Sequence, residues 1–307
     1  MPIQPYSDLS PWESNAGTGP TIRGRRSESG APLIHFLHGN GFCGGVYWPM
    51  LRHFLPQYGL ITHDIEGHGD SDNPPKFSGV EAVIQRIPQV MSDIGLPGQP
   101  LIGMGHSFGG ALTLRVAADN PGLFKALVLL DPIVMPAPFF VGVHIASMLG
   151  RHPLANASRR RRQSWASRAE VADRLRGRGT YKGWTPEALH SFVEYATRDE
   201  GDKRVLSCPA ELEAQIFERP VWPWAAFKKA QLPILFLRGN QSFSFFPRAE
   251  KLAQRANPQV LVKTLPGGHC FMQENPEATY KVVAEFLASI QSSDRAYNQL
   301  SSKRNRA

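Results

Sequence analysis

Short, fully apolar runs alternate with amphipathic segments along the first 131 residues of the chain. The apolar runs are LIHFLH (33–38), GLITHD (59–64), PLIGMG (100–105) and ALVLLD (126–131). The segments with helical spacing of apolar residues are 46–57, 81–94 and 107–119. Apolar strands separated by helices are typical of a parallel sheet whose two faces are both covered. The pattern therefore predicts an α/β fold with a mostly parallel central sheet and helices on both faces.

This alternation stops between residues 139 and 229, which contain helical patterns and four of the six tryptophans but no apolar strand of the earlier kind. It resumes with strands at 232–238 and 260–265, a helix from Pro247, and an amphipathic helix over 276–290. We predict a core formed by residues 1–138 and 230–292, a helical cap insertion over 139–229, and a disordered tail over 293–307.

Length and composition predict a soluble globular protein. The chain has 307 residues, of which 42% are hydrophobic, so it can bury a full core. No apolar run approaches the roughly 20 residues of a membrane helix, and the N-terminus lacks the features of a secretion signal. We expect a cytoplasmic protein without stable membrane insertion. The three cysteines are an odd number and predict free thiols.

The net charge of +8 is unevenly distributed. Residues 139–229 carry a net charge of +6 and the tail from residue 291 carries +3, so the rest of the chain is close to neutral. The four consecutive arginines at 159–162 lack the aromatic interleaving of a nucleic-acid motif, which favours a solvated helix face. We expect no nucleic-acid partner, and nothing in the sequence indicates the oligomeric state.

The stretch GMGHSFGG (103–110) places one serine, Ser107, between Gly105 and Gly109. A sharp strand-to-helix turn needs glycines at these positions, because larger side chains would collide there. Such a turn exposes the serine hydroxyl and directs the backbone N–H of Phe108 towards the oxygen under attack. The motif predicts Ser107 as a nucleophile and Phe108 as an oxyanion donor.

With this motif the chain resembles the α/β-hydrolase superfamily. Four motifs occur in the superfamily's order: His38-Gly39, the turn GHGDS (67–71), the Ser107 turn, and Gly267-Gly268-His269. The resemblance covers about two thirds of the chain. It implies the α/β-hydrolase fold, a serine hydrolase of the esterase type with a helical cap, and a reaction that needs neither a metal nor an organic cofactor.

The resemblance also suggests the base and a second oxyanion donor. A serine hydroxyl needs a base, usually an imidazole, because imidazole titrates near neutral pH. His269 follows a strand and two glycines, at the superfamily's position for that base. The backbone N–H of Asn40 is the expected second oxyanion donor, and its side-chain amide is a possible further donor. Three other histidines, His38, His68 and His106, are expected to have structural roles.

The acid of the site is not where the superfamily usually has it. No Asp or Glu follows the strand at 232–238 until Glu250, inside the next helix. Asp131, at the end of the preceding strand, is our choice, since a carboxylate there can accept the second ring N–H of His269. Glu66 is the alternative candidate. Asp131 followed by proline is also compatible with turn chemistry alone.

Three other interpretations use the same residues. Gly103, Gly105 and Gly109 approximate a dinucleotide-binding loop, but the third glycine is one residue late. The HGN sequence at 38–40 also resembles haloalkane dehalogenases, which use an aspartate where this chain has Ser107. His63 and His68 could suggest a metal site, but no third ligand occurs at the spacing typical of one. The missing acid after residue 238 makes a non-catalytic, ligand-binding protein a further alternative.

The insertion is expected to shape the substrate pocket. Its aromatic residues are Trp165, Trp184, Phe192, Tyr195, Trp222 and Trp224. Most of them are expected to form the core of the cap, although some could line an apolar pocket. The run 139–150 is too short to span a bilayer and is a candidate for the pocket entrance. The sequence thus predicts a hydrolase acting on a carboxylic ester or a similar small acyl substrate.

Overall fold

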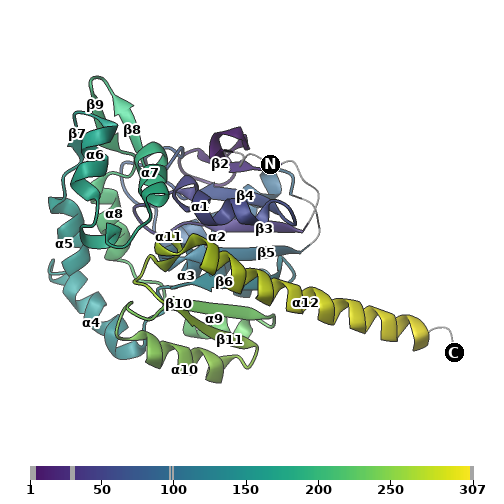
Figure 1. The fold of residues 1–307 in the computed structure, drawn as a ribbon. Helices are drawn as coiled ribbons and strands as arrows, with labels where there is room; N and C mark the ends of the chain where they lie inside the picture. The colour runs from purple at the N-terminus through teal and green to yellow at the C-terminus, as the bar shows by residue number, and fades with distance from the viewer. Residues whose placement is uncertain (1–4, 28–31, 97, 99, 305–307) are drawn as a thin grey trace.

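The computed structural model describes residues 5–27, 32–96, 98 and 100–304. Its main feature is an eight-stranded sheet in the order β1-β2-β4-β3-β5-β6-β10-β11 (Figure 1). The strands are β1 (Ser10–Ser14), β2 (Ile22–Arg26), β3 (Leu33–Leu37), β4 (Gly59–Asp64), β5 (Leu101–His106), β6 (Phe124–Leu130), β10 (Ile234–Gly239) and β11 (Val260–Leu265). From β4 to β11 neighbouring strands are parallel, while β1 and β2 form an antiparallel edge.

Alternate residues of the strands pack against helices on opposite faces of the sheet. Leu127 and Leu129 of β6 belong to a core shared with α2, α3, α9 and α10. Val128 and Leu130 face the other core, which includes α1, α11, α12 and part of the insertion. The core helices are α1 (Trp48–Leu51), α2 (Val80–Asp93), α3 (Ser107–Asp119), α9 (Trp224–Lys229), α10 (Phe246–Ala256), α11 (Phe271–Glu274) and α12 (Pro276–Arg304). The predicted α/β fold is confirmed.

Two segments, 46–57 and 293–307, differ in the structure from what the sequence predicts. The helix expected over 46–57 is a four-residue α1 between the 3-10 turns η2 (Gly44–Tyr47) and η3 (Arg52–Phe54). Gly44 and Gly45 begin η2 and Pro56 lies near the end of the segment 46–57, so both ends of this segment disfavour a longer helix. α12 extends to Arg304, through most of the segment for which composition predicts disorder. Residues 305–307 of that segment lie outside the described residues.

The insertion between β6 and β10 contains a small sheet as well as helices (Figure 1). Its elements are α4 (Ala137–Met148), α5 (Pro153–Arg160), β7 (Ser164–Trp165), α6 (Arg168–Leu175), α7 (Pro186–Tyr195), β8 (Thr197–Glu200), β9 (Lys203–Leu206) and α8 (Ala210–Phe217). β8 and β9 form a hairpin around a two-residue loop in which Gly201 has a φ of 60°. This turn favours strand pairing of short polar segments, which a search for apolar strands misses.

The described part of the chain has no helix long and apolar enough to cross a membrane.

Candidate active site

Ser107 lies at a sharp turn between β5 and α3. Its φ of 53° is a left-handed conformation that is rare for residues other than glycine. A Cβ on Gly105 would lie 2.5 Å from the carbonyl oxygen of Gly109, and a Cβ on Gly109 would lie 2.4 Å from that of His38. The two glycines therefore permit the strand and the helix to approach closely, instead of forming an open dinucleotide loop. Backbone strain of this kind is often stored at functional sites.

The ring of His269 faces the serine. His269 follows β11 and the glycines at 267 and 268, and its Nε2 atom lies 2.9 Å from Ser107 Oγ. The backbone oxygen of His269 accepts a hydrogen bond of 2.9 Å from His106 Nε2. The loop that carries His269 is thereby fixed to the residue that directly precedes Ser107.

Asp131 contacts the other side of the same imidazole ring. Its Oδ2 atom lies 2.6 Å from His269 Nδ1, and its side chain is fully buried. The Oδ1 atom accepts a 2.9 Å hydrogen bond from the backbone N–H of Gly239, and the hydroxyl of Ser242 donates to Oδ2. The loop after β10 therefore holds the carboxylate instead of supplying one. Sequence reasoning did not identify Gly239 and Ser242 as partners of the acid.

Sheet order explains why Asp131 reaches the histidine. β6 lies between β5, which leads to Ser107, and β10, while β11 is the next strand outward. The loop after β11 must pass over the ends of β10 and β6 to place His269 beside Ser107. An acid at the end of β6 is therefore directly on its path. Glu66, the alternative candidate, instead accepts a 2.7 Å hydrogen bond from the backbone N–H of Ser78.

The predicted oxyanion donors, Asn40 and Phe108, both line the cavity that contains Ser107. The side-chain amide of Asn40 donates a 2.9 Å hydrogen bond to the backbone oxygen of Glu213 in α8. One N–H of this amide thus joins the loop to the insertion, and the role of the amide as a further oxyanion donor stays a prediction, because the NH₂ group has a second N–H. The backbone N–H groups of Asn40 and Phe108 stay the candidate donors.

Three histidines hold these loops by hydrogen bonds. His38 accepts from the backbone N–H of Ile65, and His68 accepts from that of Gly41. Burial lowers the pKa of His106 well below its ordinary value, so its ring is neutral. Its Nδ1 atom lies 2.7 Å from the hydroxyl of Tyr47, which in turn accepts from Gly39 N–H. Through Tyr47, His106 thus links Gly39, which directly precedes Asn40, to the loop that carries His269.

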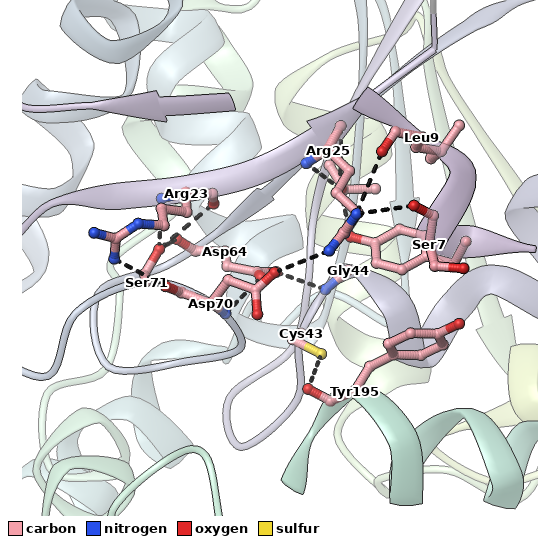
Figure 2. Close-up of polar contacts among 12 residues, drawn as sticks. Ser7, Leu9, Arg23, Arg25, Cys43, Gly44, Asp64, Asp70, Ser71 and Tyr195 are labelled. Atoms are coloured by element: carbon pink, nitrogen blue, oxygen red, sulfur yellow. Dashed lines mark hydrogen bonds and ion pairs between the residues drawn. The ribbon is translucent and has the colours of Figure 1, made fainter. Parts of the chain in front are cut away.

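Asp64, at the end of β4, supports the segment 39–44, which we call the oxyanion loop. Its Oδ1 atom accepts a 2.7 Å hydrogen bond from Gly44 N–H, and Oδ2 accepts from Asp70 N–H at 3.1 Å (Figure 2). Next to Gly44, the thiol of Cys43 donates to the backbone oxygen of Tyr195 in the insertion. Burial raises the pKa of Asp64 to about 7, and the hydrogen bond from Gly44 acts in the opposite direction.

This buried carboxyl is expected to make stability depend on pH. Between about pH 4 and pH 7 the folded protein keeps a proton on Asp64 that the unfolded chain has released, so the free energy of unfolding falls as pH rises. The asparagine side chain of Asp64→Asn does not titrate, so the variant lacks this dependence of stability on pH. In urea unfolding, the stability of wild type relative to the variant should fall by about 2 kcal/mol between pH 5 and pH 7. A difference that does not change with pH would contradict this assignment.

A cavity of about 850 Å³ adjoins the serine and the histidine. Its apolar lining includes Phe42, Phe108, Phe139, Val143, Leu154, Trp165, Tyr181, Phe217, Phe243 and Phe245. Of the six aromatic residues singled out from the insertion, Trp165 lines the cavity. Trp184 and Phe192 instead pack against Tyr181 and each other in the cap. Phe139 and Val143 place α4 at the cavity, as expected for the run 139–150.

The arginine run has more than one role. Arg159 forms ion pairs with Glu211 and Glu218, whereas Arg161 and Arg162 line the cavity. The expectation of a simple solvated helix face therefore does not hold for Arg161, which is partly buried beside Glu213, whereas Arg162 lines the cavity with a side chain that is also exposed to solvent. They follow the end of α5, where the chain turns towards β7, and this turn is not visible in the spacing of the arginines.

Comparison with known proteins identifies the family. A model described as the alpha/beta hydrolase family matches residues 36–282, so the chain belongs to this family. Human monoglyceride lipase is 33% identical over 142 residues, which cover 44% of this chain and 46% of the lipase. The sn-1-specific diacylglycerol lipase ABHD11 of Mus musculus is 26% identical over 262 residues, covering 84% of this chain and 81% of that enzyme.

Solved structures agree with the fold. The crystal structure of E-2-(acetamidomethylene)succinate hydrolase gives a TM-score of 0.75 at 21% identity and covers 91% of this chain and 99% of that chain. A thioesterase domain from the curacin biosynthetic pathway gives a TM-score of 0.73 at 19% identity, with coverage of 90% and 99%. At these identities the likeness concerns the fold alone. The chain has the α/β-hydrolase fold, as its motifs predict.

Proposed function

We propose that this protein hydrolyses carboxylic esters or similar small acyl substrates through an acyl-enzyme on Ser107. The observation that carries the proposal is the unbroken chain of contacts from Ser107 Oγ to His269 Nε2, and from His269 Nδ1 to Asp131. These contacts join residues from three distant parts of the sequence beside one apolar cavity. The names of two relatives, both lipases, support an ester as the substrate.

Each group has a defined part in the reaction. His269 Nε2 accepts the proton of Ser107 as the oxygen attacks the acyl carbon, and it later gives this proton to the leaving group. Asp131 holds the ring in the required tautomer and stabilises the imidazolium that forms. The N–H groups of Phe108 and Asn40 stabilise the negative charge on the carbonyl oxygen. Water then attacks the acyl-enzyme by the same route, and the reaction uses no metal or organic cofactor.

The alternative of a non-catalytic binding protein rested on the lack of a carboxylate after β10. Asp131 lies within hydrogen-bond distance of His269, so this observation no longer favours that alternative.

Labelling with a fluorophosphonate tests the proposal. Such a probe phosphonylates a serine only when a base activates it, so we expect one adduct, located by peptide mass spectrometry at Ser107. Ser107→Ala should melt like the wild type and stay unlabelled. A folded wild-type protein that gives no adduct, or an adduct at another serine, would refute the proposal. NADH fluorescence titration in parallel tests the dinucleotide interpretation, and we expect no binding.

A further inference from the structure

The cavity beside Ser107 has a lining with an excess of positive charge. Five arginines contribute to it, which we call the arginine cluster: Arg161, Arg162, Arg174, Arg178 and Arg219. Among the described residues of this lining, Glu213 is the single carboxylate. A guanidinium is charged at every accessible pH and is the preferred side chain for binding carboxylate and phosphate groups.

Arg161 lies close to the oxyanion loop. Its Nη2 atom is 2.9 Å from Glu213 Oε2. The other oxygen of Glu213 faces Gly41, since a Cβ on Gly41 would lie 2.5 Å from it. Within the described part of the chain, Arg161 Nε has no hydrogen-bond partner. Arg161 therefore keeps a donor that is not used by protein groups, one ion pair away from Asn40 and Gly41.

The other members of the cluster are only partly neutralised. Arg162 Nη2 lies 2.9 Å from Glu170, and Arg174 shares the same carboxylate at 3.8 Å. Arg219 donates to the backbone oxygen of Gln215, which carries no charge. No carboxylate among the described residues lies within ion-pair distance of Arg178 or Arg219. The cluster thus holds more positive charge than its neighbours balance.

The rest of the cavity suits a different part of a ligand. Its remaining lining is dominated by aromatic and aliphatic side chains, so it favours a hydrocarbon or aryl group. A neutral ester would satisfy these walls but leave the excess positive charge of the arginine cluster unbalanced. A ligand with an apolar body and an anionic end would satisfy both parts of the cavity.

We propose that the substrate is an ester or thioester with an anionic group, a carboxylate or a phosphate, remote from the scissile carbonyl, and that the arginine cluster binds this group. The inference rests on the proposed function and narrows its substrate class. The anion can belong to the acyl chain or to the leaving group. In either position, charge-assisted hydrogen bonds from guanidinium groups fix the orientation of the acyl carbon towards Ser107.

Two matched substrate pairs test the inference. The first pair places the anion on the acyl side: mono-p-nitrophenyl adipate against p-nitrophenyl hexanoate. The second pair places it on the leaving group: hexanoyl-coenzyme A against S-hexanoyl-N-acetylcysteamine. We expect the anionic member of at least one pair to have a kcat/KM about tenfold or more higher, as a charged hydrogen bond provides. The preference should decrease at high salt. Equal values within both pairs would overturn the inference.

Variants connect the preference to the arginines. In the double variant Arg174→Gln/Arg178→Gln, the ratio of the two kcat/KM values should fall by at least threefold. Arg176→Gln is the matched control, because Arg176 is an exposed arginine of the same segment that does not line the cavity. Its ratio should equal that of the wild type. A preference that persists unchanged in the double variant would show that Arg174 and Arg178 do not bind the anion.

A binding measurement separates this inference from the proposed function. Ser107→Ala should bind monomethyl adipate more tightly than methyl hexanoate in isothermal titration calorimetry, and adding the two arginine substitutions to this variant should reduce the difference. If the wild type cleaves neutral esters but neither kinetics nor binding favours the anion, the inference fails and the proposed function stands. If no ester is cleaved but the anion is bound preferentially by the cluster, the proposed function fails and anion binding by this cavity is supported.

Discussion

Replacing Asp131 by asparagine is expected to lower kcat for ester hydrolysis about ten thousandfold while the fold stays intact. The carboxylate now accepts three hydrogen bonds, from Gly239 N–H, His269 Nδ1 and the hydroxyl of Ser242. With asparagine, the oxygen can keep the bond to Gly239, but the amide N–H₂ then faces His269. The ring must accept at Nδ1 and carry its proton at Nε2, so it can no longer take the proton of Ser107. Loss of the correct tautomer has an effect of this size in serine proteases.

Asparagine is the appropriate substitution because of the backbone at this position. Asp131 has a φ of 43°, a left-handed conformation that asparagine adopts more readily than most residues. Alanine would add backbone strain to the loss of the carboxylate and would mix two effects. The melting temperature of Asp131→Asn should therefore stay within a few degrees of the wild type.

The measurement compares kcat for a p-nitrophenyl ester in two acid-to-amide variants. Glu66→Gln is the matched control, since Glu66 is also a buried acid after a strand of the sheet, but it bonds to Ser78 instead of the histidine. It should retain wild-type turnover. Unchanged turnover in Asp131→Asn, or a loss that occurs in Glu66→Gln instead, would assign the acid elsewhere.

The strands and the serine turn are predictable from the sequence because both depend on local physics. A fully buried strand must be apolar throughout, and the turn at Ser107 needs small residues two positions away on each side. Asp131 was a choice between candidates, since its closeness to His269 depends on the order of β5, β6 and β10 in the sheet. The pairing of β6 with β10 joins residues more than a hundred positions apart, as the contact between Asp131 and Gly239 does.

Other contacts that the sequence did not reveal cross the boundary with the insertion. The amide of Asn40 bonds to Glu213, which is 173 positions away, and Arg161 reaches the cavity through the turn after α5. No periodic pattern indicates such contacts. A run of arginines has the same composition whether it faces water or a pocket, so only the fold distinguishes the two cases.

Replacing Gly109 by alanine is expected to destabilise the protein by several kcal/mol and to reduce kcat/KM by about a hundredfold or more. A Cβ at this position would lie 2.4 Å from the carbonyl oxygens of both Leu37 and His38, which belong to the backbone at the end of β3. Neither oxygen can rotate away, so α3 must move from the sheet and carry Ser107 with it. A displacement of about 1 Å at a reacting group is enough for a hundredfold loss.

The same substitution in another helix separates this clash from the general effect of alanine. Gly142 lies within α4, and a Cβ there would meet no atom within 4 Å. Gly142→Ala should leave stability unchanged or raise it slightly, because alanine favours the helix. Thermal unfolding and ester hydrolysis of the two variants give the comparison. If Gly109→Ala keeps the activity and stability of Gly142→Ala, α3 can approach β3 without glycine, and close packing does not determine the position of Ser107.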